Sequence, residues 1–232
     1  MKKKLTIATV LLIVFAATFQ ACKKDDYKND GGLHNAKVDM TTYDYLKSKK
    51  GIFDSLVYLI DRAGLKEMVN SDITFFAATN YAVVDFMKAK KIIRDQIYND
   101  ENMPYSMDSI PLQVLKDSLL TYMFPGKINR DQMTVAGKVL DSKLGAIPNT
   151  KFIIRLSRRE DYGAYLKYVD YVQLGKIIGT RDDEQADPDN VPPEEKDIIE
   201  DCQTSGIITN TGIIHVMFGN HHLFFNSERT SN

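Results

Sequence analysis

The chain has 232 residues, with 30 Lys or Arg against 31 Asp or Glu, so its formal net charge is −1. This balance excludes a chain-wide basic surface of the kind that binds nucleic acid. Hydrophobic residues make up 44% of the sequence, enough for one sizeable core or two small ones. Only two cysteines are present, which excludes a framework of several disulfides.

Residues 1–21 have the pattern of a secretory signal peptide. Three lysines precede an apolar run over residues 5–17, and Ala21 places a small residue directly before Cys22. The run is shorter than the about 20 residues that a bilayer-spanning helix needs. A cleaved leader is therefore predicted, with a retained membrane anchor helix as the less favoured alternative.

Cys22 is the predicted anchor. The sequence Phe-Gln-Ala-Cys at 19–22 resembles a loose lipobox, in which the cysteine receives acyl chains such as palmitate. Lys-Lys-Asp-Asp at 23–26 resembles the surface-export signal of bacteroidete-type lipoproteins, and a merely soluble, charged tether is the alternative. The resemblance implies a lipid-anchored protein of the cell outer membrane, exposed on the cell surface. Residues 22–40 would then be the lipidated cysteine and a flexible tether with a reach of about 25 Å.

The next part of the chain is predicted to be mainly helical. Apolar residues at helical spacing indicate the helices; Thr or Asn caps are predicted for the first and third, Ser109 opens the last, and Gly64 ends the second. The predicted helices cover residues 43–49, 53–63, 80–90 and 111–123, with one more turn at 65–69. A buried strand is predicted at 73–77, and residues 91–110 are predicted to be irregular.

The remaining part is predicted to consist of strands. They are placed at 151–158, 165–178, 207–208, 213–218 and 223–225, with a hairpin turn at 209–212. Residues 181–201, rich in acids and proline, predict an exposed loop that cannot order itself, within an insert over 180–204. Helices followed by strands favour an α+β or mainly-β domain, with the helices packed at one edge of a sandwich.

Three segments together resemble a fasciclin (FAS1) domain. Residues 73–82 are similar to the family's first motif, 119–127 to its middle segment and 209–216 to its second motif. The family positions that these segments carry are Thr79, Asn80, Tyr122, Asn210, Gly212 and His215.

The resemblance implies a wedge-like β-sandwich over residues 41–226, followed by a tail at 227–232. It implies adhesion or extracellular binding and no shared catalytic centre. Ala78 stands where the family usually has proline. Tyr122 is followed by Met123 where the family often has the Tyr-His pair that is linked to integrin binding, so integrin recognition is not carried over.

The histidines and the second cysteine are predicted to be structural. His215, between two apolar residues of a strand, is expected to be buried, neutral and bonded to the turn at Thr79–Asn80; a metal or catalytic role is the alternative. His221 and His222 would face opposite sides of a strand, so no metal site is predicted. Cys202 is expected to be a small buried apolar residue.

Tyrosines recur at every third position of one predicted strand, which spreads their rings over both faces of a sheet. Those outside the core, together with Arg158 or Lys167, could stack on sugar rings or on a protein partner. Core or edge packing is the alternative. The candidate ligand-binding residues are Tyr162, Tyr165, Tyr168 and Tyr171.

Other chemistry is weakly indicated. The sequence at 187–190 could hold calcium but lacks the glycine and glutamate of a calcium loop, so a solvated acidic loop is favoured. No nucleophile elbow, phosphate loop or HExxH motif occurs. We therefore expect a non-catalytic module without cofactor or metal that binds glycan, matrix or protein, with an accessory role beside a TonB-dependent importer as a narrower form. An envelope hydrolase and a structural envelope linker are the alternatives.

Overall fold

The computed structural model describes residues 37–147, 150–160 and 166–225. The chain divides into two compact units, Met1–Asn35 and Ala36–Asn232, and all of the described residues belong to the second. The predicted signal peptide, Cys22, Tyr162, Tyr165 and the tail at 227–232 lie outside the described residues.

Within the described residues, five α-helices form on amphipathic segments. The Thr41 hydroxyl caps the first by accepting a hydrogen bond from the backbone N–H of Asp44 at 3.2 Å. The second buries Leu56, Leu59 and Ile60, whose spacing places them on one helical face. The helices are α2 (Thr42–Ser48), α3 (Asp54–Arg62), α4 (Lys66–Val69), α5 (Asn80–Tyr98) and α6 (Leu112–Leu120). None of the helices within the described ranges is long and apolar enough to cross a bilayer.

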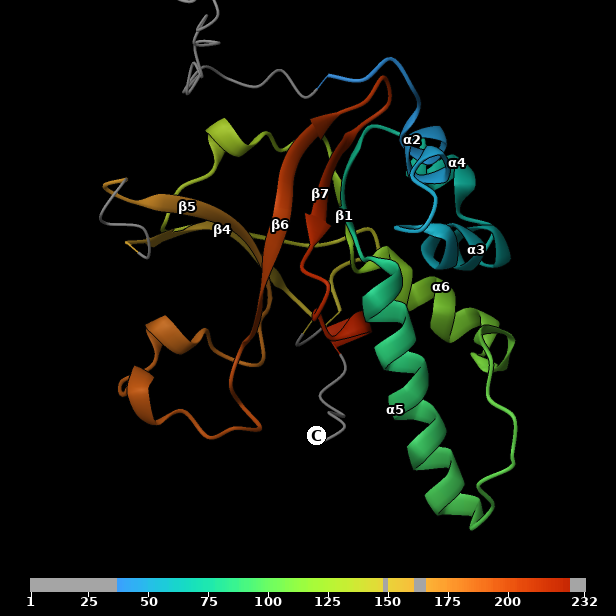
Figure 1. The fold of residues 1–232 in the computed structure, drawn as a ribbon. Coiled ribbons are helices and arrows are strands. Elements are labelled where there is room, and N and C mark those ends of the chain that lie inside the picture. Colours follow the sequence, from blue (N-terminus) through green and yellow to red (C-terminus); the bar gives the residue numbers. More distant parts are fainter. Residues whose placement is uncertain (1–36, 148–149, 161–165, 226–232) are drawn as a thin grey trace, which may run out of the picture. The chain divides into compact units, whose positions relative to one another are not determined.

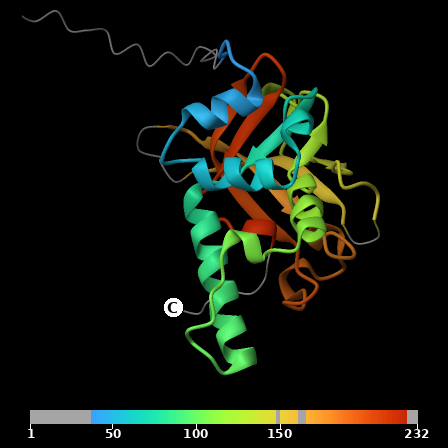
Figure 2. The ribbon, with the colours of Figure 1, turned by 90° about the vertical axis from the view of Figure 1, so that its right-hand side faces the viewer.

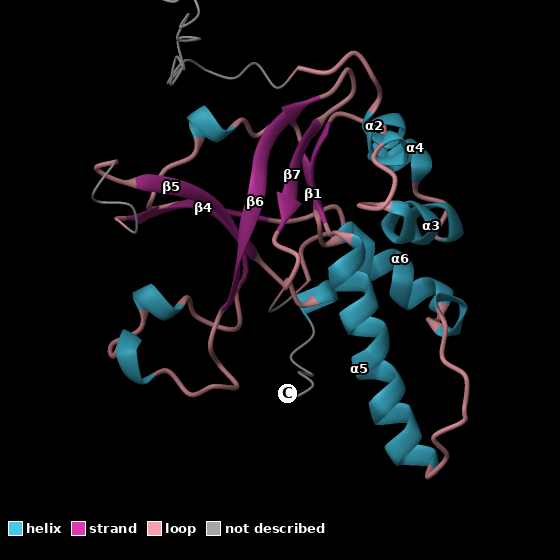
Figure 3. Ribbon diagram, viewed as in Figure 1, coloured by secondary structure: helices cyan, strands magenta, loops and turns pink. Residues whose placement is uncertain are grey.

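Seven strands form one mixed sheet in the order β2-β1-β7-β6-β5-β4-β3 (Figures 1 and 3). All neighbours are antiparallel except β1 and β7, which are parallel. The strands are β1 (Ile73–Ala77), β2 (Met123–Pro125), β3 (Lys138–Leu140), β4 (Phe152–Arg159), β5 (Val169–Lys176), β6 (Ile198–Ile208) and β7 (Ile213–Met217).

The long strand β6 joins the two halves of the sheet. Its first four residues, Ile198–Asp201, pair with β5, and from Cys202 onward it pairs with β7 through two register shifts. Such irregularities bend a strand and increase its twist. The distal parts of β4 and β5 therefore extend past β6 as a two-stranded arm, Leu156–Arg159 and Val169–Val172 (Figure 1).

A single apolar core lies between the sheet and the helices, which gather on one side of it (Figure 2). Its centre is aromatic: Phe124 lies edge-to-face against Phe76 and Phe152, and Phe225 stacks on Tyr122 with ring centroids 5.4 Å apart. Edge-to-face rings are favoured because the positive edge of one meets the negative face of the other. The α+β class is confirmed by this arrangement.

The prediction that residues 91–110 are irregular is partly wrong, because α5 continues to Tyr98. The sequence there lacks a core-facing apolar stripe, and side-chain contacts stabilise it instead. Lys91 pairs with Asp95 at 2.6 Å, and the Arg94 guanidinium lies over the rings of Tyr98 and Tyr105. Asn99, in the left-handed conformation, then ends the helix.

Three strand predictions need correction. Residues 223–225 form a 3₁₀ turn rather than a closing strand. The short strands β2 and β3 were not predicted, since three residues are too few to show a period. Met123, predicted as the last residue of a helix, begins β2, because α6 ends at Leu120. The acidic insert ends at residue 197 rather than 204, because β6 begins at Ile198.

The insert is also more ordered than its composition predicts. The Asp182 carboxylate accepts a hydrogen bond from the N–H of Asp197 at 3.1 Å, and the Asp197 carboxylate accepts from the N–H of Asp182 at 3.1 Å. Asp197 also accepts from the N–H of Ile178 at 3.0 Å. Two carboxylates thus close the loop by bonding its backbone, a local effect that average composition cannot reveal.

Candidate functional site

The turns of the first and second motifs, at Thr79–Asn80 and at 209–212, each connect separate parts of the domain through hydrogen bonds. Asn80, the first residue of α5, accepts a hydrogen bond from the N–H of Ser55 through its side chain at 2.9 Å. Its own N–H donates to Ile52 at 2.8 Å, so this turn fastens α5 to α3. Thr79 precedes the helix and is buried, but its hydroxyl makes no capping bond.

The second turn fastens the start of the domain. The backbone N–H of Asn210 donates to Met40, and Val38 donates to Ile208. Gly212 is required for close approach, since a Cβ there would lie 2.6 Å from the carbonyl oxygen of Ile73. Residues 37–42 therefore lie against the end of the β6–β7 hairpin.

His215 is buried, as predicted, but its predicted partner is wrong. Nδ1 accepts from the N–H of Gly206 at 3.2 Å, and Nε2 donates to the carbonyl of Ile128 at 3.2 Å. Burial lowers the pKa of His215 to about 4, so the ring is neutral with its proton on Nε2. The parallel pairing of β1 and β7 places Phe76 opposite His215, and the turn at Thr79–Asn80 lies beyond that pair.

A second buried polar group was not predicted. The Tyr122 hydroxyl lies 2.6 Å from Nε2 of His221 and accepts the N–H of Phe224 at 2.6 Å. Nδ1 of His221 lies 3.6 Å from the Glu200 carboxylate, and Nδ1 of His222 lies 3.1 Å from the same oxygen. The two histidines face one carboxylate because they lie in a turn and not on a strand.

Burial sets the protonation of this group. Burial raises the pKa of Tyr122 well above its ordinary value and lowers the pKa of His221. For Glu200, burial alone would raise the pKa, but its contacts with the two histidines lower the pKa overall. In the short contact between them, the Tyr122 hydroxyl donates a hydrogen bond to Nε2 of the neutral His221.

Carboxylate, imidazole and hydroxyl thus stand in a row, as in a hydrolase, but Tyr122 and His221 are each only 2% exposed. The hydroxyl is already bonded on both sides, so it serves the core. Among the described residues, no group of three or more His, Cys, Asp or Glu side chains could hold a metal ion.

The exposed candidates lie on the β4–β5 arm. The Arg158 guanidinium lies 3.7 Å from the centre of the Tyr168 ring, which is 41% exposed. Nε and Nη2 of Arg158 donate to the two Asp170 oxygens at 2.8 and 2.9 Å. These bonds hold the pKa of Asp170 below its ordinary value. Arg130 donates to the Asp170 carbonyl at 2.8 Å.

A second arginine–tyrosine pair lies on the other face of the arm. The Arg159 guanidinium lies 5.0 Å from the centre of the Tyr171 ring and donates to Asp201 at 2.5 Å. Tyr171 is only partly exposed. Tyr171 lies within β5 and Tyr168 directly before it, each beside an arginine of β4.

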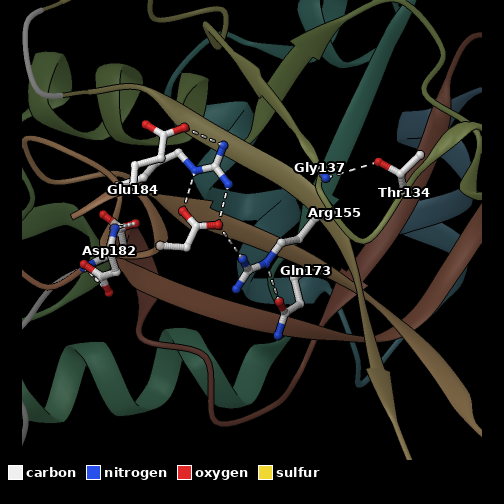
Figure 4. A network of polar contacts seen from close by, with 9 residues as sticks. Thr134, Gly137, Arg155, Gln173, Asp182 and Glu184 are labelled. Carbon is white, nitrogen blue, oxygen red and sulfur yellow. Dashed lines mark hydrogen bonds and ion pairs between the residues drawn. The ribbon is translucent and has the colours of Figure 1, made fainter. Parts of the chain in front are cut away.

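Arg159 ends a row of polar contacts that continues along the sheet. Asp201 also accepts from Gln173 at 2.8 Å. Gln173 in turn accepts from Arg155 at 2.9 Å (Figure 4). Arg155 then lies 4.0 Å from Asp183 of the acidic insert.

Arg181 holds that end of the insert. Its guanidinium donates to both oxygens of Asp183, at 2.9 and 2.6 Å, and lies 3.2 Å from Glu184. These acids are engaged by an arginine, and Asp182 and Asp197 bond backbone N–H groups. The ion pairs of Arg181 therefore lie within the insert, and the Arg155–Asp183 pair links the insert to the sheet.

Neither a known family model nor a curated protein matches this chain. The likeness to fasciclin domains consequently depends on the three segments alone.

Proposed function

We propose that this chain is a non-catalytic binding module, fasciclin-like in fold and held to the outer membrane by acylation of Cys22. It works at the cell surface by contact with a glycan, matrix or protein ligand. An accessory role beside a TonB-dependent importer is a narrower form of the same proposal.

The sheet supports the fasciclin-like part. The first motif forms β1, the middle segment ends in β2, and the second motif forms β7. β1 pairs with both of the others, so segments far apart in sequence become neighbours at one end of the sheet. Such adjacency is what a shared wedge-like sandwich would require.

The attachment of the first described residues supports the surface role. Residues 37–42 lie at the β6–β7 turn, and the far end of α5 lies at the opposite pole in two perpendicular views (Figures 1 and 2). A lipid on Cys22 would therefore be linked to the domain on the side of this turn and not at the end of α5.

The Arg158–Tyr168 stack is the single observation that carries the binding role. The ion pair to Asp170 fixes the guanidinium in place, so the exposed ring and its cation are ordered before any ligand arrives. Ordering in advance reduces the entropy lost on binding. Exposed tyrosine and arginine are also the residues that dominate binding interfaces.

The test uses the full chain, probed with a glycan array and with solubilised outer membranes. Tyr168→Ala should abolish a wild-type signal. Tyr58→Ala, which removes a tyrosine of equal 41% exposure from α3, should leave it intact. Equal binding by all three proteins would contradict the proposed surface. Mass spectrometry of the native protein checks the anchor, and an unmodified Cys22 would contradict it.

An envelope hydrolase is the second candidate, favoured by the row Glu200–His221–Tyr122. It ranks lower because a substrate would have to displace the core to reach the hydroxyl. Ester or glycan hydrolysis that is lost in His221→Asn, with the fold intact, would reverse this ranking.

A further inference from the structure

The Arg158 side chain has donors left over for a ligand. A guanidinium carries five N–H donors in a planar fork. Asp170 takes one from Nε and one from Nη2, and the side chain remains 47% exposed. Within the described ranges, no other acceptor bonds to this group. Its outer edge therefore presents paired donors to solvent.

The charges around the stack leave a positive surplus. Arg158 bonds to the Asp170 carboxylate and Arg130 to the Asp170 backbone carbonyl, so two cations lie beside one carboxylate. Glu160 and Lys167, both exposed at the same end of the arm, cancel each other in charge. Among these described side chains the cations exceed the carboxylates by one, beside an exposed aromatic ring.

The remaining contacts hold this surplus in place. Arg159 is neutralised separately by Asp201 on the other face, so it adds no charge to the Tyr168 side. Arg130 is tied to a backbone carbonyl and cannot swing toward Asp170 to release Arg158 without losing that bond. The free N–H edge of the Arg158 guanidinium thus faces solvent in one orientation. This orientation favours the binding of a planar anion through two parallel hydrogen bonds over loose association with mobile counterions.

From this geometry we infer that the Arg158–Tyr168 stack binds an acidic glycan, with a uronic-acid carboxylate on the guanidinium edge and the sugar ring against Tyr168. This inference rests on the proposed binding function and names its ligand class. A uronate offers both features that the site matches: a planar carboxylate for two parallel N–H bonds and a flat apolar ring face. A neutral sugar would use only the ring, and an acidic peptide only the charge.

The experiment measures binding of the full chain, purified in detergent, to three probes by titration calorimetry. They are oligogalacturonate, the same oligosaccharide methyl-esterified, and polyglutamate. Esterification removes the charge and keeps the rings. We expect oligogalacturonate to bind at least about tenfold more tightly than either of the others, and its affinity to fall as salt is added.

Variants locate the site. Arg158→Gln should weaken oligogalacturonate binding by about tenfold, and Arg158→Lys by less, since lysine keeps the charge but loses the fork. Arg155→Gln, on the same strand but bonded to Gln173, should bind like wild type. Thermal melting of each variant confirms that it is folded.

Equal affinity for the acid and the ester, or for polyglutamate, would overturn the acidic-glycan inference. So would unchanged binding by Arg158→Gln. Binding of neutral sugars that depends on Tyr168 would overturn this inference and leave the proposed function standing. The proposed function itself fails only if Tyr168→Ala alters no binding at all.

Discussion

The buried group around Tyr122 and the exposed group around Tyr168 use similar parts in opposite settings. Each joins a tyrosine to a nitrogen base and a carboxylate: His221 and Glu200 inside, Arg158 and Asp170 outside. In the buried group the His221 imidazole is neutral, and the hydrogen bonds of the group stay within the core. In the exposed group the Arg158 guanidinium is charged and keeps N–H donors for a ligand. Burial therefore separates a structural group from a binding group, although the residue types barely differ.

The largest expected difference between the two regions is in stability. Tyr122→Ala should lower the free energy of unfolding by about 3–5 kcal/mol. The substitution leaves a cavity among packed aromatic rings, and the backbone N–H of Phe224 loses its hydrogen-bond acceptor. Tyr168→Ala should change it little. Urea unfolding of both variants measures the contrast. Similar losses at the two sites would show that the arm is part of the core.

Acid should destabilise the interior through His215. The unfolded chain binds a proton near the ordinary pKa of 6.5, whereas the folded protein does so only near pH 4. Stability therefore falls as the pH drops from about 6.5 to about 4, by about 3 kcal/mol, and levels off below that range.

Urea unfolding across this pH range tests the assignment, with His215→Gln as the variant that cannot titrate. The variant should be less stable at pH 7 but should lose less between pH 6.5 and 4. Some slope should persist, since burial also lowers the pKa of His221. An unchanged slope would place the acid sensitivity elsewhere.

The sequence predicted those parts of the interior that depend on local pattern. Helix α2 follows from its Thr41 cap, α3 and α6 follow from apolar spacing, and β1 and the β6–β7 hairpin follow from apolar runs around turn residues. The partners of His215 could not be predicted, because Gly206 and Ile128 come within hydrogen-bonding distance of it only once the strands have paired in the folded chain. Tyr122 and His221 are 99 positions apart, and no local pattern links them.

The exposed group was easier to predict in composition than in geometry. A strand with tyrosines at every third position indicates rings on both faces, and Arg158 was a candidate neighbour of an exposed ring. The sequence did not indicate Asp170 or Arg130, which fix the guanidinium. Their positions depend on the twist of the arm and on the loop before β3, which arise only in the folded chain.

Glu200 is intermediate in burial between the Tyr122 core and the exposed Tyr168 stack, with its side chain 14% exposed. Glu200→Gln should lower the free energy of unfolding by about 1–2 kcal/mol at pH 7, since a charged acceptor for two histidines is lost. It should also lower the pKa of His221 further, because the carboxylate is what raises it against burial. An NMR titration of the histidines measures this shift. A rise in the pKa of His221 would contradict the assigned contact.

The smallest expected effect on stability is at the arm. Arg158→Gln should leave the thermal midpoint unchanged, because solvent screens an ion pair whose arginine is 47% exposed. The same change should raise the pKa of Asp170 toward its ordinary value, since the bond to Arg158 is the main cause of its lowering. An NMR titration of the Asp170 carboxyl tests the second effect, with Arg155→Gln as the control. A lowered midpoint would make the stack a structural element, and the distinction between the two tyrosine groups would then be one of degree.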